Sequence, residues 1–163
     1  MLSGGARLAA RLRAVSAEHL LAARAEDRAL LAKSGVTAVL LPVTALTAAP
    51  GARCPGREMV DAGVPVALGT DCSPNSWVEA MPLVLAAGVN SARLSPAEAL
   101  TAATVNAAHA SGLEDAGTIA PGRPADFAVF PLPSVDQLGY RFDAIPADVF
   151  RQGIRFSPPA LRQ

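Results

Sequence analysis

Two apolar stretches decide the fold class of this chain: VTAVLLPV at residues 36–43 and PVALGT at residues 65–70. Short, uninterrupted apolar runs of this kind are typical of strands covered on both faces, as in a parallel sheet. A shorter strand is predicted at residues 15–20, and helices at residues 6–13, 25–34 and 57–62. Strands that alternate with helices indicate βα units and therefore an α/β fold.

The pattern changes after Asp71. Residues 44–56 read as a loop, residues 77–89 and 96–113 as helices, and residues 126–132 and 149–156 as β-rich segments. The second of these helices has Ser95 at the N-cap, Pro96 in the first position and Glu98 in the first turn, which are residues favoured there. Three βα units cannot close a barrel, and their sheet would have open apolar edges. The chain therefore reads as part of a larger fold.

Charge and composition exclude several classes of function. The 163 residues include 14 basic and 14 acidic side chains, so nothing electrostatic favours nucleic acid or an anionic membrane as partner. A 51% apolar content argues against disorder, and the longest apolar runs fall far short of the ~20 residues that cross a bilayer. Two Cys cannot form a disulfide framework, which favours a reducing compartment.

Two residues at predicted strand ends could carry chemistry. Asp71 follows the strand at residues 65–70 and opens a polar loop, and active sites of parallel α/β folds form at such ends. Its carboxylate could bind a metal or act as a general base, or could simply cap the loop through an Asx-turn. His19 lies at the end of the first strand, where a lone His is either a packing residue or a catalyst facing the same cleft.

For the other reactive side chains, the sequence pattern favours structural roles. Cys54 and Cys72 lack the CxxC spacing of a thiol site, and Cys72 is expected to pack inward. His109 lies among alanines in a predicted helix and is expected to be structural. The Arg-rich, acid-free first 15 residues read either as a transit peptide or as a plain amphipathic helix.

At these residues the sequence resembles the C-terminal half of the imidazolonepropionase family, within the amidohydrolase superfamily. The matching segments are residues 15–20 (VSAEHL), 38–42 (AVLLP), 64–71 (VPVALGTD), 104–108 (TVNAA), 117–127 (GTIAPGRPADF) and 140–142 (YRF). The segment at residues 117–127 is shared widely across the superfamily, whereas the His19 strand, the LLP run and YRF are narrower. The match includes residues 4–6 and the first helix, which argues against a transit peptide.

The resemblance implies a fold and a reaction. Residues 1–113 are expected to form the C-terminal part of a (β/α)8 barrel, about its last three βα units with following helices. Residues 114–163 are expected to supply the C-terminal strands of a small β-sandwich. The implied reaction is hydrolysis of a cyclic C–N bond in 4-imidazolone-5-propanoate, a small-molecule substrate, to N-formimidoyl-L-glutamate in histidine degradation. The family uses one zinc or iron ion and is cytoplasmic and homodimeric.

The resemblance also assigns roles to five residues. Asp71 matches the metal ligand on the last barrel strand, which also takes the proton from the attacking water. His19 matches a histidine that orients or polarises the substrate. Ser73, Asn75 and Ser76 lie in the loop that binds the substrate's propionate, where the family has Asn, Gly and Ser or Thr.

Two departures from the family pattern leave alternatives open. The family's His-x-His pair and its strand-five His with a nearby acid have no equivalent in this sequence. We therefore expect the isolated chain to bind no stoichiometric metal and to be inactive. Ser73 and Asn75 favour, as a second hypothesis, a deaminase or another cyclic amidase. The third hypothesis is a non-catalytic remnant or a partner subunit that completes a barrel with a separately encoded N-terminal half.

Overall fold

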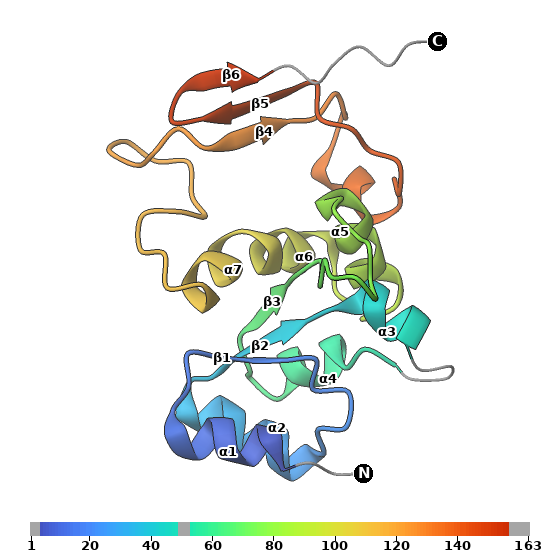
Figure 1. The fold of residues 1–163 in the computed structure, drawn as a ribbon, viewed down its shortest axis with the longest axis vertical. Coiled ribbons are helices and arrows are strands. Elements are labelled where there is room, and N and C mark those ends of the chain that lie inside the picture. The colour runs from blue at the N-terminus through green and yellow to red at the C-terminus, as the bar shows by residue number, and fades with distance from the viewer. Residues whose placement is uncertain (1–3, 49–52, 157–163) are drawn as a thin grey trace.

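The chain folds around two small sheets with helices between and beside them (Figure 1). This computed structural model describes residues 4–48 and 53–156. Strands β1 (Ser16–Glu18), β2 (Thr37–Leu40) and β3 (Val66–Leu68) form a parallel sheet in the order β1-β2-β3. Strands β4 (Phe127–Val129), β5 (Asp148–Arg151) and β6 (Ile154–Phe156) form an antiparallel sheet.

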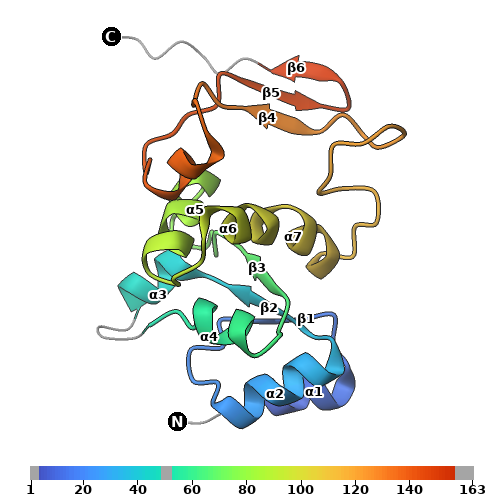
Figure 2. The same ribbon diagram turned by 180° about the vertical axis from the view of Figure 1, so that it is seen from behind.

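Helices lie on both sides of the parallel sheet. The helices are α1 (Gly5–Leu12), α2 (Ala25–Ser34), α3 (Pro42–Ala48), α4 (Gly56–Asp61), α5 (Met81–Asn90), α6 (Pro96–Ala103) and α7 (Val105–Ala110), with the 3-10 helix η1 (Val135–Gly139). Helices α1, α2 and α4 lie on one side of the parallel sheet, and α5, α6 and α7 lie between the two sheets (Figures 1 and 2). In the described part of the chain, no helix has the length and apolar character needed to span a membrane.

The core joins the parallel sheet to the helices. Val36 and Leu40 from the β2 region, Leu31 from α2, Met59 from α4 and Val84 from α5 are all fully buried. They belong to one continuous cluster that reaches Leu138 in η1. Burying several such side chains stabilises the arrangement by about 2 kcal/mol each, so the helices hold the strand ends in fixed places.

Local signals in the sequence explain several element boundaries. Gly35 follows α2 with φ +68°, a left-handed conformation that glycine adopts without steric cost. Ser95 Oγ accepts a hydrogen bond from the Glu98 amide at 3.2 Å, and Glu98 Oε2 accepts one from the Ser95 amide at 2.8 Å. This reciprocal cap begins α6 where the Ser-Pro-Ala-Glu pattern predicts it.

Other boundaries differ from the prediction. The strand predicted at residues 36–43 ends at Leu40, because Pro42 begins α3 and proline fits the first turn of a helix. The loop predicted at residues 44–56 was therefore wrong in its first part, and residues 49–52 lie outside the described residues. The helix predicted at residues 96–113 is broken at Thr104, whose φ of −122° and ψ of −88° are not helical. The helix predicted from residue 77 begins at Met81, next to Pro82.

Candidate functional site

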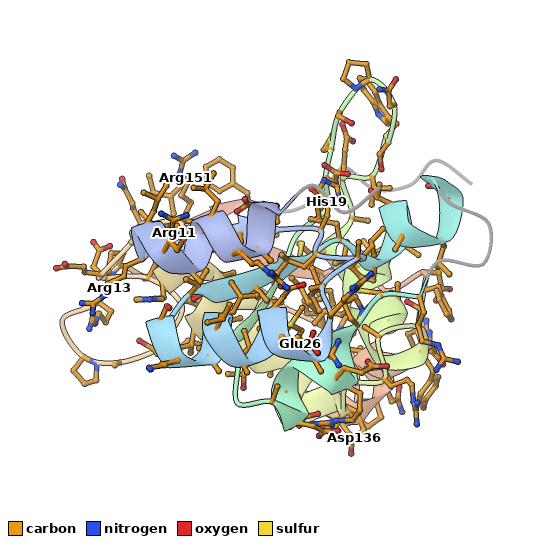
Figure 3. All side chains as sticks on the ribbon, turned by 90° about the horizontal axis from the view of Figure 1, so that it is seen from below. Arg11, Arg13, His19, Glu26, Asp136 and Arg151 are labelled. Atoms are coloured by element: carbon orange, nitrogen blue, oxygen red, sulfur yellow. The ribbon has the colours of Figure 1, made fainter. Side chains whose placement is uncertain are left out.

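His19 lies at the carboxyl end of β1. Its backbone amide donates a hydrogen bond to the Val39 carbonyl at 3.0 Å, and its side chain is exposed. His19 and Leu20 have φ values of +64° and +56°, so the chain turns sharply away from the sheet here. Positive φ is costly for a side chain such as Leu, and such positions concentrate at functional sites. Figure 3 shows His19 on the side of the molecule from which the loop after β3 projects.

Asp71 follows the other outer strand of the same sheet. It lies three residues beyond the end of β3, is half-buried and has φ +56°. The loop is capped by Thr70, whose Oγ1 accepts a hydrogen bond from the Cys72 amide at 3.3 Å. Among the described residues, the Asp71 carboxylate receives no hydrogen bond. Thr70, rather than Asp71, therefore caps this turn, and the Asp71 carboxylate is not used by it.

The sheet brings His19 and Asp71 to the same edge but does not put them in contact. Parallel strands carry their carboxyl ends to one edge, and β2 separates β1 from β3. Two strand spacings place the ends about 10 Å apart. A groove of about 850 Å³ beside α1 and β1 is lined by His19 but not by Asp71. The two residues therefore share a sheet edge, but this groove takes only His19 into its lining.

The three predicted substrate-binding residues lie in a closed loop after Asp71. Ser73 and Ser76 form two backbone hydrogen bonds with each other, each 3.0 Å long, so that Pro74 and Asn75 form the tip. Asn75 is exposed, Ser73 is half-buried and Ser76 is buried. Figure 3 shows this loop projecting from the body of the protein. The prediction that Cys72 packs inward was wrong: its side chain is exposed, in a loop that closes on itself through Ser73 and Ser76 and not against the core.

Sequence reasoning missed Thr44, which the structure places at the same edge. Thr44 lies in α3, directly after β2, and its Oγ1 is 2.9 Å from Ser76 Oγ. The available signal was its position just beyond the LLP run, at the end of the central strand. His109 is exposed near the end of α7, and nothing around it suggests chemistry.

The neighbouring helix α7 fixes the position of β3. Asn106 Nδ2 donates a hydrogen bond to the Val66 carbonyl at 2.7 Å, at the start of the strand that leads to Asp71. Within the described ranges, no three His, Cys, Asp or Glu side chains gather closely enough to hold a metal ion. Zinc sites take three or more protein ligands, so a zinc ion held by Asp71 would need ligands besides those that the described residues gather around it.

Comparison with known proteins identifies the family of this chain. The family model described as "Amidohydrolase family" matches residues 5–157. The chain is 43% identical over 155 residues to imidazolonepropionase of Geobacillus kaustophilus and 45% identical over 155 residues to that of Deinococcus deserti. These alignments cover 92% and 93% of this chain but 36% and 38% of the relatives. The chain thus spans about a third of the length of the curated relatives it matches.

Solved structures agree on the fold. An adenosine deaminase from Xanthomonas campestris with bound zinc superposes with a TM-score of 0.74 at 28% identity, covering 86% of this chain and 36% of that one. The A. niger ochratoxinase superposes with a TM-score of 0.77 at 22% identity, covering 98% of this chain and 41% of that one. The chain has the amidohydrolase α/β fold, and it belongs to the amidohydrolase family.

Proposed function

We propose that this chain is the C-terminal part of an imidazolonepropionase-type hydrolase, which opens the ring of 4-imidazolone-5-propanoate to give N-formimidoyl-L-glutamate. The observation that carries the proposal is the free carboxylate of Asp71 at the same sheet edge as His19, in a chain 43–46% identical to imidazolonepropionases. In this proposal β1, β2 and β3 are the last strands of a (β/α)8 barrel. Strands β4, β5 and β6 belong to a small β-sandwich.

Each residue has a role that its position allows. Asp71 takes the proton from the water that attacks the ring carbon, for which a free, half-buried carboxylate is suited. His19 orients or polarises the substrate from the carboxyl end of β1, the other outer strand. The loop with Ser73, Asn75 and Ser76 binds the propionate group through hydroxyl, amide and backbone donors. The ring C–N bond then breaks, and its nitrogen takes up a proton.

The complete enzyme is proposed to contain one zinc or iron ion. The zinc bound in the Xanthomonas deaminase supports a metal in this fold, and Asp71 would be one ligand. Among the residues that the structure describes, no cluster supplies the remaining ligands. In this proposal they come from the part of the relatives' length that this chain does not span. The homodimer stays a prediction.

The test is reconstitution with the missing part of the fold. The chain is co-expressed with the N-terminal two thirds of the Geobacillus relative, and loss of 4-imidazolone-5-propanoate is followed. We expect turnover that Asp71→Asn lowers by at least 10³-fold and His19→Ala by about 10²-fold, whereas Cys72→Ser leaves it unchanged. A purified, metal-loaded complex of the two parts that does not hydrolyse this substrate would contradict the proposal.

A deaminase is the second candidate. The 28% identity to an adenosine deaminase and the replacement of the family's Asn and Gly by Ser73 and Asn75 favour it. A panel of cyclic amides and amino-purines, offered to the same complex, separates the two. Turnover of imidazolone propionate alone supports the first candidate, and release of ammonia from an amino-purine supports the second.

A further inference from the structure

We propose that Thr44 is a positioning residue for the substrate-binding loop and that it acts through the hydroxyl of Ser76. The inference rests on the proposed function, because the loop's role in binding substrate is part of that proposal. Its physical basis is the 2.9 Å contact between Thr44 Oγ1 and Ser76 Oγ, which joins residues 32 positions apart. This contact links the segment after β2 to the segment after β3.

Ser76 is the residue at which the loop is closed. Its amide and carbonyl both bond to Ser73, and its carbonyl also accepts a hydrogen bond from the Val78 amide at 3.0 Å. Only 9% of Ser76 is exposed. Because these backbone bonds tie Ser73 and the tip to Ser76, whatever fixes Ser76 also fixes the groups that the tip presents.

The hydroxyl pair is suited to both anchoring and binding. Two hydroxyl groups carry two hydrogens, and the bond between Thr44 and Ser76 uses one of them. The other remains free to donate, and either oxygen can take either role. A carboxylate accepts hydrogen bonds only, so the pair offers it one donor at a fixed place. That chemistry matches the propionate group of the proposed substrate.

The neighbouring Thr47 provides a matched control on the same helix. Its Oγ1 donates to the carbonyls of Val43 and Thr44, at 3.4 and 3.2 Å. These bonds stay within α3, so Thr47→Val removes a hydroxyl from the helix without touching the loop. A general effect on α3 would appear in both variants, whereas a positioning effect appears only when the hydroxyl at Thr44 is lost.

Amide hydrogen exchange of the purified full chain tests the anchor. In Thr44→Val, we expect the amides of Ser73 and Ser76 to exchange about fivefold faster, the change that one lost hydrogen bond produces. Thr44→Ser should restore the slow exchange, and Thr47→Val should leave it unchanged. If Thr44→Val does not fold, Ser76→Ala removes the same bond from the other side. Unchanged loop exchange in these variants, or equal acceleration in Thr47→Val, would overturn the proposal.

Kinetics of the reconstituted complex connects the anchor to substrate binding. Thr44→Val should raise KM for 4-imidazolone-5-propanoate about fivefold and leave kcat within twofold, because the carboxylate contact is made in the ground state as well. Thr44→Ser should restore KM. If Thr44→Val instead lowered kcat about fivefold and left KM unchanged, the positioning role would be overturned. An inactive unmodified complex would refute the proposed function alone, since the exchange measurement decides independently whether Thr44 anchors the loop.

Discussion

At the scale of single residues, the backbone is unusual where chemistry is proposed. His19, Leu20 and Asp71 all have positive φ, and all three follow strands of the parallel sheet. A non-glycine residue in this conformation costs of order 1 kcal/mol or more. The surrounding contacts must hold it there, such as the bond from the His19 amide to the Val39 carbonyl. The backbone at each strand end therefore helps to set where these two candidate catalytic residues lie.

The buried thiol of Cys54 predicts an effect of pH on stability. Cys54 is 2% exposed, and burial, followed by the nearby Glu58 carboxylate, raises the pKa of its thiol to about 12. The unfolded thiol ionises near pH 9, so the folded state binds the extra proton between those values. The free energy of unfolding should therefore fall as pH rises from about 9 towards 12. Urea titrations of wild type and Cys54→Ala at several pH values between 9 and 12 check this. An equal fall of the free energy of unfolding with pH in both proteins would contradict it.

Thiol labelling provides a second measurement, on both cysteines. In the native chain, a thiol reagent should modify Cys72, which is exposed, and spare Cys54. One equivalent should react in buffer and two in urea. Cys72→Ser should abolish the native reaction, whereas rapid labelling of both thiols in buffer would show that Cys54 is not held in the core.

At the scale of elements, Arg57 joins α4 to α6. Its guanidinium donates to both carboxylate oxygens of Glu98 at 3.0 and 3.1 Å, and to Asp61 at 2.9 Å. The hydrogen bond from Arg57, followed by that from the Ser95 amide, lowers the pKa of Glu98. A single carboxylate thus serves both the helix cap and the link between two helices.

Replacing this carboxylate should have a measurable, pH-dependent cost. Glu98→Gln should lower the free energy of unfolding by about 1 kcal/mol at pH 7, because solvent screens a pair that is about a third exposed. The pKa is lower in the folded state, so this stability is present above the unfolded value near 4.5 and is lost as pH falls through the folded value. Thermal melts at pH 7 and pH 3 check the difference, which should shrink at the lower pH. A stability difference between wild type and Glu98→Gln that is the same at both pH values would contradict this prediction.

The contact between α4 and the segment after α5 requires a glycine at position 56. A Cβ at Gly56, the first residue of α4, would lie 2.5 Å from the Ala92 carbonyl oxygen and 2.7 Å from its Cβ. Backbone cannot yield cheaply, so Gly56→Ala should destabilise the chain by about 2 kcal/mol. At Gly139 the nearest atoms are side chains of Val89 and Pro96 at 3.3 Å or more, so Gly139→Ala should cost less. Equal urea midpoints for the two variants would contradict this.

Sequence patterns predict these elements where the determinant is local. Gly35, Ser95 and Glu98 set helix ends through contacts within a few residues, and the apolar runs predict the buried strands. The break at Thr104 was missed because no local pattern marks it. In the structure, Gly117, with φ +85°, packs against this point, and a Cβ there would lie 2.9 Å from the Thr104 carbonyl oxygen. The contact between Thr44 and Ser76 spans 32 residues, and no short-range signal reports it.

At the scale of the whole molecule, several large apolar side chains remain exposed. Leu8, Leu12 and Val15 are exposed beside β1, one of the two outer strands of the parallel sheet. In the other part of the molecule, Ile119 and Ile154 are exposed as well. Exposed apolar side chains beside an unpaired strand edge, as at β1, are a feature of surfaces that other protein segments cover. This supports the proposal that further parts of the amidohydrolase fold pack against β1.

Metal binding tests that proposal on the molecule as a whole. Asp71 provides one carboxylate, and zinc needs three or more protein ligands, so the purified chain dialysed against zinc should retain well under one ion per molecule. The complex with the N-terminal two thirds of the Geobacillus relative should retain about one, and Asp71→Asn should weaken that binding by at least tenfold. Elemental analysis of both samples gives the ratio. One tightly bound zinc in the isolated chain would show that its own side chains complete a site, and the division of the metal centre between two parts of the fold would then be wrong.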